Sequence, residues 1–206
     1  MTPIRIEDLN LQNIRCVVFD LDGTLYDKRR LPLRLVFGDF PYVLHLAAER
    51  IARKQLRGKR FKSAKQFYKE LFRRLANVRL IRAEKAKQWF YKRYMPLTLR
   101  LLRKHYEVAP FVPELLKQLK ERGIRTAVLS DYGFAEEKLQ AIGLDPENFD
   151  YVFSAPELGG LKPNKEAFEK MLAILQVEPH EALMIGDRTE CDGEGAAAVG
   201  MPFYKV

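Results

Sequence analysis

The chain has 206 residues, of which 47% are hydrophobic and 31% are charged, a composition that is typical of a folded globular protein and excludes a disordered or fibrous chain. It contains no apolar run near the ~18–20 residues that a membrane-spanning helix needs, and its first residues, with Arg5, Glu7 and Asp8 among them, do not resemble a secretory signal. The only cysteines, Cys16 and Cys191, share no CxxC spacing, which excludes a disulfide scaffold and a structural zinc site and predicts a reducing, cytoplasmic location.

The formal net charge of +9 is distributed unevenly along the chain. Residues 28–108 contain 24 of the 36 lysines and arginines but only five acidic residues, a net charge of +19, whereas the remaining residues carry a net charge of −10. A chain polarised in this way is predicted to form two structural units, with joints near residues 28 and 108. The excess positive charge of the basic segment indicates an anionic partner.

The first predicted element is a strand over residues 16–19, a continuously apolar run. Continuous apolar runs are typical of strands that are covered on both faces, as in a parallel sheet. Asp20 and Asp22 follow the run directly, and two carboxylates two residues apart at a strand end can face the same pocket. Gly23 comes next and allows the backbone to turn sharply there.

The basic segment shows only helical periodicity. A pattern over about 32–56 is interrupted by Gly38 and Pro41, a second begins at Ala64, and a third covers about 83–105 with a kink expected at Pro96. These patterns predict a small helical bundle inserted after the first strand.

Beyond the basic segment, apolar runs alternate with helical patterns. The predicted strands are 126–129, 151–153 and 182–185, and the predicted helices cover about 113–122, 134–142, 164–176 and 190–199. Such alternation predicts an α/β fold with a parallel sheet and right-handed crossovers.

Polar residues follow each of the later runs: Ser130 after the second, Lys162 after the third, and Asp187 with Asp192 after the fourth. The carboxyl ends of parallel strands lie along one edge of a sheet, so these residues and the first aspartates are expected to converge on one crevice. Carboxylates packed together repel one another and raise one another's pKa, unless a cation neutralises them. An all-oxygen donor set without cysteine or histidine favours Mg²⁺ over zinc. The cation, Lys162 and the Ser130 hydroxyl would then cradle a phosphoryl group.

The same residues resemble the signature motifs of the haloacid dehalogenase-like hydrolases, in the order that family carries them. The matching stretches are VVFDLDGTLYD (17–27), LSD (129–131), LKP (161–163) and MIGDRTECD (184–192). The resemblance implies a Rossmann-like three-layer core over 1–27 and 109–206, with an all-helical C1-type cap over 28–108 that closes over the pocket. Many relatives carry Pro-Gly after the cap, where this chain has Pro110-Phe111.

The resemblance also implies a role for each matching residue. Asp20 resembles the nucleophile that forms an aspartyl-phosphate, and Asp22 the general acid/base, whose backbone carbonyl also holds the metal. Lys162 resembles the cation that steadies the nucleophile and phosphate. Ser130 resembles the hydroxyl that binds the phosphate. Asp187 resembles the direct metal ligand, together with Asp20. Asp192 resembles an acidic residue that acts through metal-bound water or the lysine.

The function expected from these residues is Mg²⁺-dependent hydrolysis of the phosphomonoester of a small anionic metabolite. The dehalogenase branch of the family lacks the second carboxylate of the first motif, so Asp22 favours phosphate chemistry. Two alternatives stay open: a phosphomutase of the same fold, and a nucleic-acid or polyanion binder that uses the basic helices. The sequence leaves open the physiological substrate, the cap residues that contact it and the oligomeric state.

Overall fold

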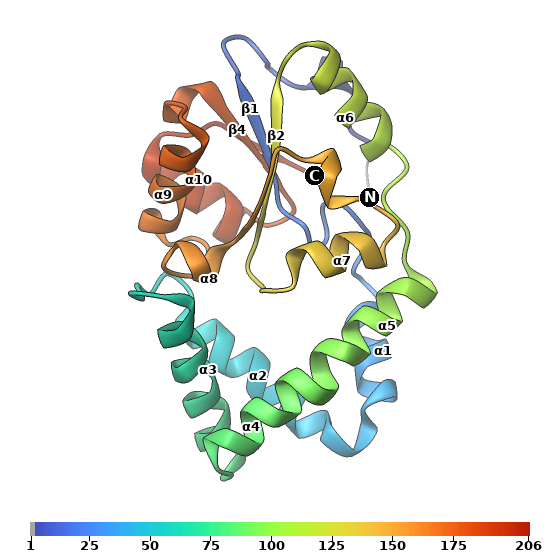
Figure 1. The fold of residues 1–206 in the computed structure, drawn as a ribbon, viewed down its shortest axis with the longest axis vertical. Coiled ribbons are helices and arrows are strands. Elements are labelled where there is room, and N and C mark those ends of the chain that lie inside the picture. Colours follow the sequence, from blue (N-terminus) through green and yellow to red (C-terminus); the bar gives the residue numbers. More distant parts are fainter. Residues whose placement is uncertain (1–2) are drawn as a thin grey trace.

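A computed structural model describes residues 3–206 of the chain. Its centre is a five-stranded, entirely parallel sheet with the strand order β3-β2-β1-β4-β5 (Figure 1). The strands are β1 (Cys16–Phe19), β2 (Arg125–Ser130), β3 (Tyr151–Ser154), β4 (Ala182–Gly186) and β5 (Phe203–Lys205). The predicted α/β fold with a parallel sheet is therefore confirmed.

The first strand lies in the middle of the sheet. Phe19 is in register with Val128 of β2 and Ile185 of β4, and the amide of Asp20 donates to the carbonyl of Ile185 at 2.8 Å. All four residues of β1 are buried, because helices cover the sheet on both faces and each face of the strand packs in its own core. This burial explains why the strand has a continuous apolar sequence.

Five helices flank the sheet: α6 (Val112–Glu121), α7 (Ala135–Ala141), α8 (Ala155–Leu158), α9 (Lys165–Leu175) and α10 (Glu194–Val199). Figure 1 shows α6 and α7 on one side of the sheet and α8 to α10 on the other. The two sides and the sheet make three layers, and the helices alternate with strands along the chain as the sequence pattern predicts.

The segment between β1 and α6 is built of helices joined by loops, and its helices lie beyond the carboxyl edge of the sheet (Figure 1). It contains α1 (Leu31–Gly38), α2 (Val43–Leu56), α3 (Ala64–Arg79), α4 (Ala83–Trp89) and α5 (Met95–His105). Each has an apolar stripe at helical spacing that packs inward, as Phe67, Leu71 and Leu75 do on α3.

Some local features differ from the sequence pattern. The third helical pattern of the basic segment is two α-helices joined by a π-helical turn over Phe90–Tyr94, and Pro96 lies in the first turn of the second helix. The proline removes one helical N–H and crowds the preceding turn, and the wider π-helical turn directly before it accommodates this interruption. The sequence reading did not anticipate the short edge strand β5 or the one-turn helix α8. Within residues 3–206, no helix is both long and apolar enough to cross a membrane.

Candidate active site

A buried lysine joins two of the predicted site residues. The ammonium Nζ of Lys162 lies 2.6 Å from Asp20 Oδ1 and 2.6 Å from Asp192 Oδ1, and it donates to the carbonyl of Leu129 at 3.0 Å. The Lys162 side chain has no exposed surface. A buried ammonium needs such partners, since an unpaired charge in the interior is strongly unfavourable.

Asp20 is nearly buried at the end of β1. Burial raises the pKa of its carboxyl group to about 6, although the positive charge of Lys162 opposes the shift. Its second oxygen, Oδ2, accepts a hydrogen bond from the hydroxyl of Thr24 at 3.1 Å. Lys162 and Thr24 thus fix the orientation of this carboxylate.

Three carboxylates gather at this point. One oxygen from each of Asp20, Asp187 and Asp192 lies within 4.8 Å of the other two. Asp187 Oδ1 is buried without a hydrogen-bond partner, and burial raises the pKa of this residue. Asp192 reaches the cluster from a π-helical turn over Thr189–Gly193, and its Oδ2 accepts from the amide of Arg188 at 3.2 Å. Such an all-oxygen set with an unsatisfied oxygen is suited to a divalent cation.

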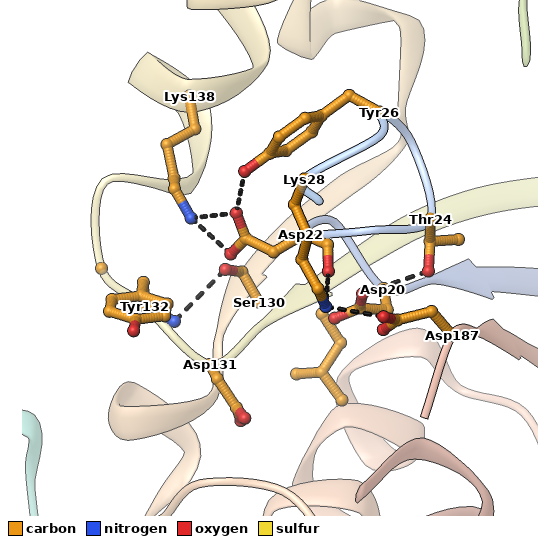
Figure 2. A network of polar contacts seen from close by, with 12 residues as sticks. Asp20, Asp22, Thr24, Tyr26, Lys28, Ser130, Asp131, Tyr132, Lys138 and Asp187 are labelled. Atoms are coloured by element: carbon orange, nitrogen blue, oxygen red, sulfur yellow. Dashed lines mark hydrogen bonds and ion pairs between the residues drawn. The ribbon is translucent and has the colours of Figure 1, made fainter. Parts of the chain in front are cut away.

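The carboxylate of Asp22 has different partners. Lys138, from α7, contacts both of its oxygens, with Nζ 2.6 Å from Oδ1, and the Tyr26 hydroxyl donates to Oδ1 at 2.5 Å (Figure 2). Burial acts to raise the pKa of Asp22, but the charge of Lys138 and the two hydrogen bonds outweigh it and lower the pKa. The side chain is therefore held in its ionised form.

The loop after β2 is held by hydrogen bonds to its own and neighbouring groups. Ser130 is fully buried, and its hydroxyl accepts a hydrogen bond from the amide of Tyr132 at 3.2 Å (Figure 2). The carboxylate of Asp131 accepts from the amide of Lys162 at 2.8 Å and from Arg188 Nη2 at 3.4 Å. These bonds tie the segment around Ser130 to that around Lys162.

A third lysine, Lys28, points into the site from the connection between β1 and α1. The ammonium Nζ of Lys28 donates to the backbone carbonyl of Asp22 and lies 2.6 Å from Asp187 Oδ2 (Figure 2). Gly23 makes this approach possible: its φ is +103°, and a Cβ there would lie 2.6 Å from Asp187 Oδ2 and 2.7 Å from Lys28 Nζ.

The helical segment touches the same loops. Arg53 of α2 donates to the carbonyl of Asp131 at 2.9 Å, and its guanidinium carbon lies 3.5 Å from the ring centre of Tyr132. The hydroxyl of Tyr68 accepts from the amide of Gly133 at 3.1 Å. The amide of Phe61 donates to the carbonyl of Gly159 at 2.6 Å. The helical segment therefore contacts the loop that follows β2 and the end of the one-turn helix α8.

The structure brings five of the six predicted residues into two adjoining groups. One group contains Asp20, Lys162, Asp187 and Asp192. The other is Asp22, whose backbone carbonyl is connected to Asp187 of the first group through Lys28. The sixth, Ser130, ends β2 beside them, with its hydroxyl turned to its own loop.

Sequence reasoning did not assign Lys28, Lys138, Tyr26 or Arg53 to the site. Lys28 was placed only at the joint with the basic segment. Lys138 and Arg53 are two among many basic helical residues, and only the tertiary structure separates them from their solvated neighbours.

A family model described as haloacid dehalogenase-like hydrolase matches residues 14–200. The chain belongs to this family. The family resemblance drawn from the four motifs is thereby confirmed, and the match includes strands β1 to β4, the site residues and the helical segment.

Individual relatives match to different extents. The human haloacid dehalogenase-like hydrolase domain-containing protein 3 is 33% identical over 102 residues, which are 49% of this chain and 40% of that protein. The chain thus spans well under two thirds of the length of that relative. The phosphoglycolate phosphatase of Aquifex aeolicus is 27% identical over 91% of this chain and 82% of its own. The crystal structure of a predicted phosphoglycolate phosphatase from Haemophilus somnus superposes with a TM-score of 0.66 at 20% identity, covering 94% and 85% of the two chains, and so shares the fold.

Proposed function

We propose that this protein is a Mg²⁺-dependent phosphatase that hydrolyses the phosphomonoester of a small metabolite through an aspartyl-phosphate on Asp20. The observation that carries the proposal is the pairing of Asp20 with the buried Lys162, beside the carboxylates of Asp187 and Asp192. A buried ion pair fixes the attacking carboxylate, and the surrounding charges suit a transferred phosphoryl group. The phosphatase named among the relatives supports the same chemistry.

The divalent cation fits the residues present. Asp187 offers a buried oxygen without a partner, and Asp20 and Asp192 offer oxygens within reach of it. Asp20, Asp187 and the carbonyl of Asp22 would hold the ion, with Asp192 acting through Lys162 or a bound water. When bound, the ion supplies positive charge that offsets the repulsion between the carboxylates and the phosphoryl group.

The reaction then proceeds in two displacements. Asp20 attacks the phosphorus, and the bond from phosphorus to the ester oxygen breaks. Asp22, which Lys138 and Tyr26 keep ionised, takes the proton of the phosphomonoester monoanion and gives it to the leaving oxygen. A water molecule next attacks the phosphorus of the aspartyl-phosphate and passes a proton back to Asp22, and the bond to Asp20 breaks with release of inorganic phosphate. Lys162 stays paired with Asp20 throughout, while the Ser130 hydroxyl donates a hydrogen bond to a phosphoryl oxygen.

We further propose that residues 28–108 are a cap over a catalytic core made of 1–27 and 109–206. This division is supported by Arg53 and Tyr68, which contact the loop after β2 from the helices. These contacts hold the helices against a loop of the site. A closed cap excludes water from the reacting groups and selects the substrate. Its net charge of +19 favours an anionic substrate.

The test is phosphate release from p-nitrophenyl phosphate and from a panel of sugar phosphates, nucleotides and phosphorylated acids. Release is expected with Mg²⁺, is abolished by a chelator, and falls by at least about a thousandfold in Asp20→Asn. Asp27→Asn is the matched control, because Asp27 pairs with the exposed Arg29 and is itself partly exposed. Full turnover by Asp20→Asn would overturn the proposal, and a requirement for a bisphosphate with little net phosphate release would indicate a phosphomutase instead.

A further inference from the structure

Lys28 occupies an unusual place for a lysine in a connecting segment. Its neighbour Arg29 has a side chain that is 79% exposed and pairs with Asp27. The side chain of Lys28 is only 33% exposed and instead turns inward, so that its Nζ contacts the carbonyl of Asp22 and the carboxylate of Asp187 (Figure 2). The ammonium is held there by the negative carboxylate of Asp187 and by the partial negative charge of the Asp22 carbonyl oxygen.

These two oxygens belong to the groups that would hold the divalent cation in the proposed function. An ammonium within contact distance of Asp187 Oδ2 repels a divalent ion on the same carboxylate, because the two positive charges would lie only a few ångströms apart. Lys28 leaves Asp187 Oδ1 without a partner, so the ammonium satisfies the site only in part. The carboxylate of Asp187 can therefore bind either the Lys28 ammonium or the divalent ion, but not both at the same time.

We propose that Lys28 is a tethered competitor of the divalent cation. Its ammonium neutralises Asp187 and caps the Asp22 carbonyl when the ion is absent, and it must withdraw before the ion binds. Lys28 thus lowers the affinity of the site for the metal. This inference rests on the proposed function only in its assignment of the metal ligands, and it requires no catalytic step.

The position of Lys28 in the chain gives its withdrawal a second effect. Lys28 lies three residues before Leu31, the first residue of α1, and its carbonyl accepts from the amide of Leu31 at 2.9 Å. Withdrawal of the ammonium breaks the side-chain contacts of this connection with Asp22 and Asp187, while the main-chain bond to Leu31 does not involve the ammonium.

The test measures metal binding directly on the full chain without substrate. Mn²⁺ is titrated and the free ion is followed by electron paramagnetic resonance, and Mg²⁺ binding is followed by calorimetry. Lys28→Met removes the charge and keeps the length, Lys28→Arg keeps the charge, and Arg29→Met removes a neighbouring charge outside the site. Lys28→Met is expected to bind both ions roughly ten- to a hundredfold more tightly than the wild type, because a charge-assisted hydrogen bond no longer has to be broken.

The other variants decide between local competition and a general effect of charge. Lys28→Arg is expected to stay well below Lys28→Met in affinity, and Arg29→Met is expected to change affinity by no more than about threefold, since exposed charges are screened. Equal or weaker metal binding by Lys28→Met overturns the inference, as does equal tightening by Arg29→Met. Absence of metal binding in every variant also overturns it.

Thermal melting gives a second readout and checks folding. With chelator, Lys28→Met is expected to melt below the wild type because Asp187 loses its counter-charge, and Mg²⁺ should raise its melting temperature by more than it raises that of the wild type.

Phosphate release in the same proteins separates the two proposals. Tighter binding by Lys28→Met without hydrolysis in any variant rejects the proposed function alone, and Mg²⁺-dependent hydrolysis without tighter binding rejects the competition alone.

Discussion

Lys138 forms an ion pair with Asp22 across 116 residues of sequence, and only 3% of the lysine side chain is exposed. The ammonium of Lys138 also lies 4.6 Å from the ring centre of Tyr132. The guanidinium of Arg53, from the helical segment, packs against the same ring. The carboxylate proposed to transfer protons is therefore connected, through an aromatic ring, to an arginine of the proposed cap.

Replacement of Lys138 is expected to impair turnover more than substrate binding. In Lys138→Met, Asp22 loses the partner that fixes its carboxylate, so kcat should fall roughly ten- to a hundredfold, part of the contribution of a positioned acid/base, while KM changes less. Steady-state kinetics with Lys138→Arg as the conservative variant measure the effect. Lys117→Met, which removes an exposed lysine of α6, is the control, and an unchanged kcat in Lys138→Met would contradict the role of Lys138.

Loss of Lys162 is expected to destabilise the protein as well as inactivate it. Lys162→Met leaves Asp20 and Asp192 buried without a counter-charge, which lowers the free energy of unfolding by about 3–5 kcal/mol at neutral pH. Urea denaturation in the presence of a chelator measures the loss, and Lys165→Met, at an exposed pair with Glu169, should stay within about 1 kcal/mol of the wild type.

The pH dependence of Lys162→Met has a definite sign. Without the lysine, the pKa of the Asp20 carboxyl is expected to lie further above its value in the unfolded chain, because burial raises it and the opposing charge of Lys162 is lost. The folded state then binds more protons than the unfolded state, so stability rises as the pH falls through this folded pKa. The difference from the wild type should shrink between pH 7 and pH 5, and a constant difference would contradict this explanation.

Arg53 is expected to stabilise the contact between the helices and the loop after β2. Its guanidinium pairs with Glu49 at 2.7 Å, and both side chains are buried. Arg53→Met should lower the free energy of unfolding by about 3 kcal/mol, since it leaves the Glu49 carboxylate unpaired, and Glu49→Gln in the same chain should restore part of the loss. Urea denaturation of the single and double variants tests this, with the exposed Arg50→Met as control. No recovery in the double variant would contradict the importance of the ion pair.

The two cysteines are expected to resist thiol reagents in the folded protein. Burial raises the pKa of Cys16 to about 12 and that of Cys191 to about 11, so the reactive thiolate is scarce at neutral pH. Both side chains are also fully buried. A chromogenic disulfide reagent should titrate no thiol in buffer and two in denaturant, and rapid labelling of a thiol in the native protein would contradict the prediction.

The sequence was sufficient to predict the sheet and most of the site, because both depend on local patterns. The four apolar runs are strands β1 to β4, and polar residues placed just after parallel strands converge by geometry, as Asp187 does on Asp20. Lys162 reaches Asp20 from farther along the chain, after the one-turn helix α8. The strand β5 was missed because its three residues are only partly buried or exposed at the sheet edge and carry no continuous apolar run.

The remaining site residues depend on tertiary packing. Lys28 and Lys138 resemble many other lysines in composition and spacing, and their roles follow from the direction of one side chain and the placement of α7. The orientation of the Ser130 hydroxyl toward Tyr132 likewise depends on the turn of the loop after β2. Such features require knowledge of which segments meet in space, and no periodicity encodes it.

Two of the hydrogen bonds between the helical segment and the rest of the chain have backbone carbonyls as their acceptors, that of Gly58 in the loop 57–63 and that of Gly159 opposite it. Phe61 donates its amide to the Gly159 carbonyl, and Asn164 donates to the Gly58 carbonyl at 3.2 Å. A main-chain group is offered by almost any amino acid, so the exposed side chains of Lys59 and Arg60 in this loop can be replaced without loss of these two bonds, while Gly58, at a φ of +67°, and the buried Phe61 stay constrained. Evolution of a new specificity could therefore proceed by altering the side chains of this loop while the seam between the two parts of the molecule is inherited unchanged.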